Sequence, residues 1–159
     1  MVQNCGMLVL LICSLLSTSV AAGKEEVRMN GEESKVIELI SKMTSEFQKG
    51  SIDGVLNSYE SGASVMFEPG KQVSDPTVLK EMFKGAFTLN PKFSYPNGHE
   101  VYVSNDLALH IAPWVMAAEA PDGTAIEQTG LSVSVLRKQD NGHWLLVLDN
   151  PHGQILMDK

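Results

Sequence analysis

Three titratable side chains stand in or at the end of apolar runs, where a proton-transferring group would lose contact with water. Glu68 ends an apolar run just before Pro69, Asp149 ends another near the C-terminus, and His110 lies inside a third. Loss of water disfavours the charged form of a carboxyl group and moves its pKa toward the range used in acid–base catalysis, whereas an imidazole already titrates near that range. Glu68, His110 and Asp149 are therefore candidate catalytic residues, with Glu68 as the base.

Each of these residues also has a structural explanation. Glu68 could lie solvated in an exposed turn, and His110 could be a hydrogen-bonded residue of the core or of an interface. Asp149 could fix the C-terminal turn, with Arg137 or nearby backbone amides as its partners. The sequence alone leaves both explanations open at all three positions.

Four further side chains could line a ligand pocket beside these groups. Phe67 precedes Glu68 and would exclude water, and Trp114 alternates with His110 along one apolar run. Gln128 stands on the face opposite its apolar neighbours and could orient a ligand, while Tyr59 could direct its hydroxyl into the pocket. Large apolar side chains on a buried strand are also ordinary core residues, so this role needs a structure to test it.

Charge and composition exclude several classes of function. The 159 residues carry a formal net charge of -7, which disfavours binding to nucleic acid or to an anionic membrane surface. The histidines lack the paired spacing of metal ligands, and both cysteines, Cys5 and Cys13, lie near the N-terminus. No glycine-rich phosphate loop or nucleotide motif is present. We expect neither a metal nor an organic cofactor.

The first 23 residues predict a cleaved export signal. Residues 7–16 form a short uncharged apolar run, small residues follow, and Lys24 begins a charged segment. The run is short for a membrane span, although an uncleaved anchor is the alternative because residues 1–6 contain no Lys or Arg. We expect cleavage after Ala22 or Gly23, a flexible leader over 24–32, and a periplasmic or secreted protein that leaves the membrane after cleavage.

The remaining pattern predicts helices first and strands afterwards. Apolar residues at steps of three and four predict helices over about 33–48, 52–59 and from Asp75–Pro76 onward, where Asp75 is an N-cap. Turn residues then separate strands near 99–104, 107–119, 124–138 and 143–150. This order is typical of an α+β domain, here residues 33–153 with a C-terminal tail over 154–159.

The two long strands must bend to remain in one sheet, and Pro113 and Gly130 offer places to do so. A curved sheet over helices forms a cone with a hollow end. Both faces of strands 107–119 and 143–150 are apolar, but the helices can cover only one of them. We therefore expect a homodimer through the outer face of the sheet.

The order of these elements resembles the nuclear transport factor 2-like, ketosteroid isomerase-like superfamily. The turn 50–54, the Glu-Pro-Gly at 68–70 and the antiparallel meander carry this resemblance. The C-terminal half is similar to small bacterial SnoaL-like proteins through its motifs at 122–123, 137–138, 140–144 and 149–153. The resemblance implies a cystatin-like α+β barrel, in which a cone-shaped, curved antiparallel sheet packs on three N-terminal helices.

The resemblance also implies roles for particular residues. In ketosteroid isomerases the catalytic Asp ends the strand that Glu68 ends here, whereas their oxyanion-hole Tyr falls at Met43 and their oxyanion-hole acid near Ser134. Met43 becomes a ligand-lining candidate, and steroid isomerase activity is not expected because the donors for an enolate are missing. Two functions remain: proton transfer on a small apolar molecule, or a non-catalytic dimeric binding or assembly module.

Overall fold

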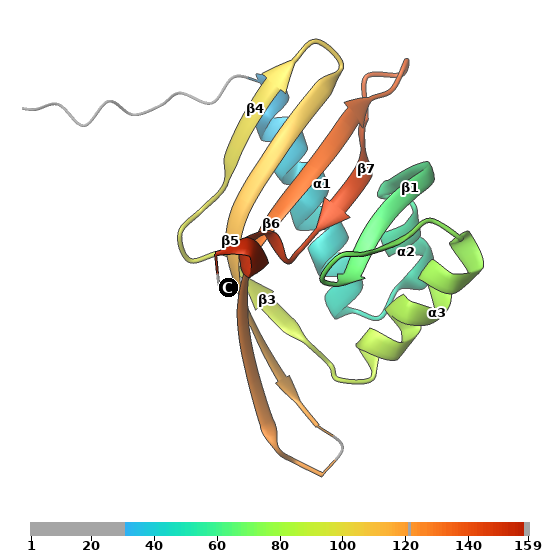
Figure 1. Cartoon of the computed structure of the whole chain (residues 1–159). Helices are drawn as coiled ribbons and strands as arrows, with labels where there is room; N and C mark the ends of the chain where they lie inside the picture. The colour runs from blue at the N-terminus through green and yellow to red at the C-terminus, as the bar shows by residue number, and fades with distance from the viewer. Residues whose placement is uncertain (1–30, 121, 158–159) are drawn as a thin grey trace, which may run out of the picture.

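The computed structural model describes residues 31–120 and 122–157, so the predicted export signal and most of the leader lie outside the described residues. Figure 1 shows the helices and strands in chain order. They are α1 (Gly31–Gln48), α2 (Ile52–Leu56), β1 (Tyr59–Glu68), β2 (Lys71–Val73), α3 (Pro76–Phe87), β3 (Lys92–Ser94), β4 (Glu100–Ser104), β5 (Leu107–Glu119), β6 (Ala125–Lys138), β7 (Trp144–Asn150) and the 3-10 helix η1 (Gly153–Leu156).

Local signals set the ends of the helices. Gly50 follows α1 with a φ of 70°, a left-handed conformation that a glycine adopts without strain. Asp75 caps α3, since its Oδ1 accepts the backbone N–H groups of Thr77 at 2.8 Å and of Val78 at 3.0 Å. Pro76 then begins the helix, where its missing N–H costs nothing.

The seven strands form one sheet in the order β2-β1-β7-β6-β5-β3, with β4 also paired to β5. All the pairings are antiparallel except that of β1 with β7, which is parallel. The expectation of a purely antiparallel sheet is therefore wrong at this one place. A parallel pair needs a long crossover connection, and here β2, α3 and the strands β3 to β6 lie between β1 and β7 in the chain.

Pro113 lies where β5 changes partners along its outer edge. β4 pairs with β5 as far as Ile111, and β3 pairs with it from Val115 onward, so Pro113 falls in the gap between the two. A residue without an N–H is tolerated at such a gap. Leu131 lies opposite Pro113 on β6, and the next pair is Gly130 with Trp114; a Cβ at Gly130 would overlap the Trp114 ring.

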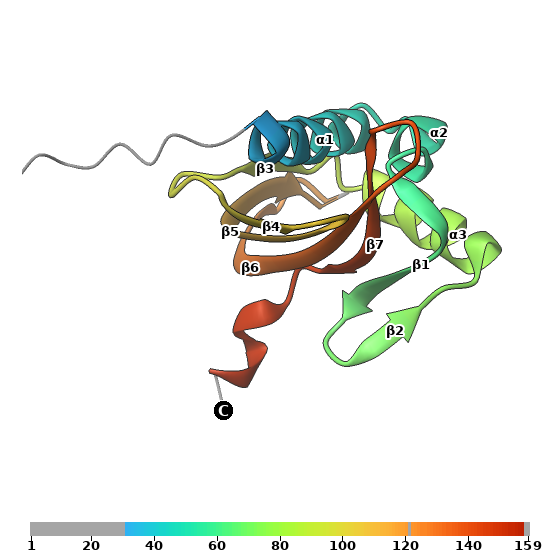
Figure 2. The same cartoon turned by 90° about the horizontal axis from the view of Figure 1, so that it is seen from above.

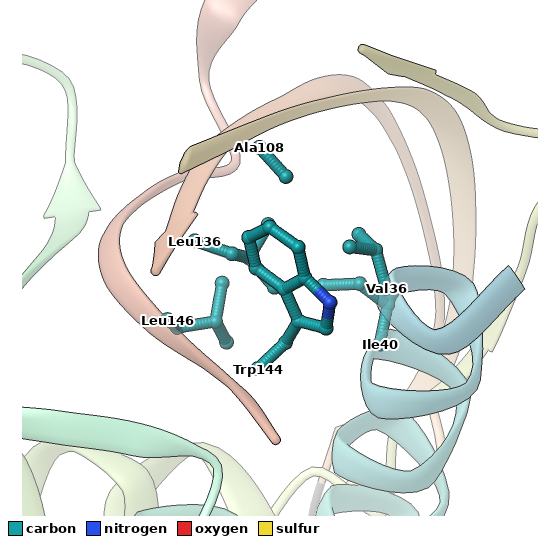
Figure 3. Packing of buried hydrophobic residues seen from close by; sticks show 6 residues of the cluster. All are labelled: Val36, Ile40, Ala108, Leu136, Trp144 and Leu146. Carbon is teal, nitrogen blue, oxygen red and sulfur yellow. The ribbon is translucent and has the colours of Figure 1, made fainter. Parts of the chain in front are cut away.

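The main core joins α1 to the inner face of the sheet. Figure 3 shows Trp144 between the helix and the strands, with side chains of α1, β5, β6 and β7 around it. The cluster consists of Val36, Ile40, Ala108, Leu136, Trp144 and Leu146, all at most 3% exposed. A second cluster of Val55, Val65, Leu79 and Phe83 joins α2 and α3 to β1. These two clusters hold the helices against one face of the curved sheet.

The opposite face of the sheet carries η1. Figure 2 shows α1 and η1 on opposite sides of the strands. The segment packs closely on β6, because a Cβ at Gly153 would meet Val133 Cγ2 at 2.6 Å, and Gln154 Oε1 accepts the N–H of Leu131 at 2.9 Å. Residues 154–156, expected to belong to a tail, are thus part of the packed structure.

Element boundaries differ from the sequence-based expectations in three other places. Residues 31–32, assigned to the leader, already belong to α1, and Tyr59 begins β1 instead of ending a helix. The short strands β2 and β3 were not expected, since three residues carry too little pattern to predict a strand. Within the described part of the chain, no helix is long and apolar enough to cross a membrane.

Candidate active site

A cavity of about 400 Å³ lies between the helices and the inner face of the sheet. Its wall combines residues of α1, β1, α3, β3, β5, β6 and β7, so nearly every element contributes. Most of the lining is apolar. Its aromatic members are Phe47, Tyr59, Phe67, Phe83, Phe93, Tyr95 and Trp114.

The aromatic side chains brace one another through edge-to-face contacts. Phe47 of α1 has ring-centroid distances of 5.9 Å to Phe83, 5.0 Å to Phe87 and 5.7 Å to Phe93. Phe83 in turn packs against Phe67 at 4.8 Å. Such contacts add about 0.5–1.5 kcal/mol per pair beyond area burial. They hold the cavity open by fixing its walls.

Asp149 is the only carboxylate among the described residues of the cavity wall. Its Oδ2 accepts the hydroxyl proton of Tyr59 at 2.7 Å, and its Oδ1 accepts that of Ser134 at 2.8 Å. Because the Ser134 hydroxyl donates its hydrogen bond to Asp149, the hydroxyl of Ser132 on the cavity wall donates to Ser134 Oγ at 3.1 Å. The carboxylate is held at the end of a chain of neutral hydroxyl donors.

The sheet explains why these groups meet. Asp149 is the residue of β7 that pairs with Ser134 on β6 and with Val65 on β1. Tyr59 begins β1, the strand that pairs in parallel with β7, and its ring centroid lies 5.7 Å from that of Phe83. Two strands that are distant in sequence therefore bring a phenol and a carboxyl group together at one end of the cavity.

Burial raises the pKa of Asp149 above its ordinary value, while the hydrogen bonds from Tyr59 and Ser134 and the nearby His152 partly oppose the rise. Burial also raises the pKa of Tyr59 far above its ordinary value, and the charge of Asp149 adds to this effect. The phenol stays protonated as a donor, whereas the carboxylate is a stronger base than a solvated one. This pairing of a base with a fixed donor suits proton transfer.

A second hydroxyl pair lies close to the first. The hydroxyls of Tyr95 and Thr44 are 3.1 Å apart, and both residues line the cavity. Burial is the main cause of a raised pKa of Tyr95. These two hydroxyls offer a ligand a hydrogen-bonding partner distinct from Asp149.

Glu68 does not face the cavity, which corrects the expected position of the base. Its side chain is 57% exposed and forms an ion pair with Lys71, the residue opposite it in the β1–β2 hairpin. The register shifts between Met66 and Glu68, and Gly70 turns the chain with a φ of 75°. The hairpin therefore carries the carboxylate into solvent, while Phe67 remains in the cavity wall.

His110 is also absent from the described residues of the wall, which corrects its assignment as a cavity acid or base. It is completely buried on the inner face of β5, and its Nε2 lies 2.9 Å from Nδ1 of His99. Burial, with the neighbouring His99 as a smaller cause, lowers the pKa of His110 to about 4. The ring is neutral near pH 7 and acts as a core residue.

The structure places the remaining five predicted residues in the cavity wall: Tyr59, Phe67, Trp114, Met43 and Gln128. Trp114 lies over Gly130 and its indole Nε1 donates to the carbonyl oxygen of Pro151 at 3.0 Å. Gln128 is exposed on the extended part of β6, which places it at the rim of the cavity. Their part in ligand binding stays a prediction.

Sequence reasoning missed His152, although it stands inside the Asp149–Gly153 motif. Its Nε2 lies 3.1 Å from the carbonyl oxygen of Phe67. A carbonyl only accepts, so Nε2 carries a proton and Nδ1 is the acceptor nitrogen of the neutral ring. His152 lines both the main cavity and a smaller hollow of about 260 Å³ beside β2. Tyr95, also missed, lies in a loop without periodic signal.

The described residues contain no candidate metal centre. Among residues 31–120 and 122–157, no three His, Cys, Asp or Glu side chains gather in a way that could hold an ion. The chemistry that the described groups can perform is acid–base chemistry by Asp149, Tyr59 and His152.

Comparison with known proteins defines the fold but not the activity. No family model and no curated protein matches the sequence. Solved structures do match. One is a nuclear transport factor 2-like superfamily protein from Salmonella enterica serovar Typhimurium, with 15% identity and a TM-score of 0.68 over 75% of this chain and 88% of its own. The chain has the nuclear transport factor 2-like fold.

Other proteins of this fold belong to different functional classes. A candidate ketosteroid isomerase from Shewanella frigidimarina is 18% identical with a TM-score of 0.63, over 76% of this chain and 96% of its own. The association domain of CaMKII from C. elegans is 14% identical with a TM-score of 0.61, over 75% of this chain and 93% of its own. The nuclear transport factor 2-like resemblance is confirmed at the level of fold, and the SnoaL-like subtype stays a prediction.

Proposed function

We propose that the protein binds a small, largely apolar molecule in the cavity and removes a proton from it with Asp149. One observation carries this proposal: a carboxylate with a raised pKa, held by Tyr59, lies in the wall of an aromatic cavity of about 400 Å³. A cavity of this size suits a small organic ligand. The carboxylate takes the role that the sequence assigned to Glu68.

The geometry supports general-base catalysis in a definite way. The apolar wall removes water from Asp149, which strengthens it as a base. The hydrogen bonds from Tyr59 and Ser134 fix the orientation of both carboxylate oxygens, so little reorganisation precedes proton transfer. His152 borders the same cavity with an acceptor nitrogen and can relay a proton.

Steroid isomerisation is not the activity that we expect of this site. Met43 is in the cavity wall where the isomerases of the resemblance carry a Tyr, and Ser134 directs its hydroxyl to Asp149 instead of to a ligand. An enolate oxygen would lack the strong donors on which that reaction depends. We expect an elimination, dehydration or isomerisation on a different carbon acid.

A nitrobenzisoxazole tests the proposal before the natural substrate is known. Ring opening of this neutral aromatic compound begins when a base takes its C–H proton, breaks the N–O bond and releases a coloured phenolate. The protein should accelerate this reaction over free acetate, and Asp149→Asn should lower the rate at least about 100-fold, the contribution of a positioned base. Glu68→Gln is the matched control and should react like the wild type, since its carboxylate is solvated. An unaffected Asp149→Asn variant would refute the assignment.

A non-catalytic assembly role is the second candidate, because the outer face of the sheet is apolar. Leu109, Ile111 and Val135 alternate with inward residues on β5 and β6, and Tyr102 of β4 is 59% exposed beside them, whereas η1 packs on the neighbouring Val133. We propose a homodimer through this face, as the sequence predicts. Sedimentation should give a dimer at micromolar concentration and a monomer for Tyr102→Arg. A monomeric wild type would contradict it.

Export remains part of the proposal through residues 1–23. An uncharged apolar run, small residues and a charged segment in this order support a cleaved signal. Intact-mass measurement on protein from its own host should show a chain that begins after Ala22 or Gly23. Retention of Met1 would contradict cleavage.

A further inference from the structure

We infer that the ligand of this cavity carries a positively charged nitrogen on a small apolar body. This inference rests on the proposed function only in taking the same cavity as the binding site. It follows from the charge, the aromatic composition and the hydrogen bonds of the wall.

The described cavity wall contains one carboxylate, and His152 is its only side chain that can become cationic. Asp149 is its one carboxylate, and none of the described lining residues is a Lys or an Arg. Both oxygens of Asp149 accept from neutral hydroxyls, those of Tyr59 and Ser134. A buried carboxylate is costly unless an opposite charge accompanies it. A cationic ligand supplies that charge, whereas an anionic ligand would add a second negative charge.

The rings of the wall favour the same ligand. An aromatic face attracts a cation, most strongly in a site without water. Trp114 and Phe93 pack edge to face at 5.7 Å on one part of the wall, and Tyr95 lines the cavity near them. Their arrangement is fixed, because Trp114 donates to the carbonyl oxygen of Pro151 and Tyr95 shares a hydrogen bond with Thr44. Binding a cation therefore requires little reorganisation of the wall.

The proposed proton transfer gives an independent reason. When Asp149 takes a proton from a C–H group, the electron pair of that bond stays on the substrate. The hydroxyls of Tyr59 and Ser134 are occupied by Asp149, and the described wall has no Lys or Arg to stabilise the pair. A positively charged nitrogen next to the reacting carbon would stabilise the charge within the substrate itself. An adjacent iminium nitrogen would take up the pair and become a neutral enamine.

The experiment compares three probes of similar size that differ in charge. They are benzyltrimethylammonium, its uncharged carbon isostere neopentylbenzene, and the anion phenylacetate. Binding to the purified protein is measured by ligand-observed NMR at about pH 8, where an imidazole is neutral. The cation should bind at least about tenfold more tightly than the isostere, the ratio expected for a cation in a partly dry aromatic site. Phenylacetate should bind most weakly.

Two variants separate the cavity charge from the net charge of the protein. Asp149→Asn should reduce the preference for the cation over the isostere to less than about threefold, which leaves only the cation–π contribution. Glu68→Gln removes a solvated carboxylate outside the cavity wall and should keep the full preference. An equal loss in both variants would mean that the overall charge attracts the probe, and this would overturn the inference.

The outcomes distinguish this inference from the proposed function. Equal binding of the cation and its isostere would refute a cationic ligand while leaving the cavity as a binding site. Failure of all three probes to bind would also refute it, and the nitrobenzisoxazole reaction would then decide separately whether Asp149 acts as a base. A cation preference that survives Asp149→Asn would overturn the role of the carboxylate.

Discussion

Removal of the Tyr59 hydroxyl should raise the pKa of Asp149. The 2.7 Å hydrogen bond from Tyr59 favours the ionised carboxylate, and Tyr59→Phe deletes it with the loss of one oxygen atom. A hydrogen bond to a charged group contributes about 1.5–3 kcal/mol. One pKa unit corresponds to about 1.36 kcal/mol, so the pKa should rise by about one to two further units. The Ser134 bond remains and keeps the carboxyl group in place.

Carboxyl-carbon NMR measures this shift without knowledge of the substrate. Titration of the Asp149 resonance in the wild type and in Tyr59→Phe gives the two pKa values directly, and the acid limb of the nitrobenzisoxazole rate should move with them. Tyr102→Phe is the matched control, because its exposed hydroxyl donates to Glu100 at 3.1 Å on the outer face. An Asp149 pKa that is unchanged in Tyr59→Phe would refute the hydrogen-bonded pair.

Three other perturbations have defined outcomes. Gly130→Ala should destabilise the protein by about 1–3 kcal/mol in urea unfolding, because the new Cβ overlaps the Trp114 ring, whereas Gly85→Ala in open space on α3 should stabilise it slightly. The pKa of His110 is lowered from 6.5 to about 4, so the buried ring favours the neutral form. The free energy of unfolding should therefore be highest above pH 6.5 and should fall by on the order of 3 kcal/mol as the pH drops from 6.5 to about 4. His110→Gln should show a flatter pH dependence of the free energy of unfolding. Glu68→Gln should change the unfolding free energy by less than about 0.5 kcal/mol, as expected for an exposed ion pair, and a larger change would place it in the packed structure.

Local signals predicted much of the fold. The Asp75 cap and the turns around Asn105, Gly123 and Gly142 are set by a few neighbouring residues, and all three turn residues adopt a positive φ. Six strand ends and one helix start follow from these positions. The cone itself could be expected because helices precede strands too long to remain flat.

The site was predictable only in part because side-chain direction depends on distant partners. Glu68 lies in solvent because a three-residue strand, β2, pairs with it and sets Lys71 opposite. His110 does lie on the inner face that alternation predicts, but His99 covers it, and no pattern in the sequence reveals that contact. Asp149 and Tyr59 could each be selected from the sequence, whereas the hydrogen bond between them could not, because it joins two strands that are distant in the chain.

Parallel pairing of β1 with β7 builds the candidate base from two strands that are far apart in the chain. The hydrogen bond between Tyr59 and Asp149 spans 90 positions of the chain, so a large loop must close before it can form. A growing or truncated polypeptide that lacks β7 holds a phenol but no carboxylate opposite it. The proposed base therefore depends on the docking of β7 against β1, and a chain cut before β7 should lack it.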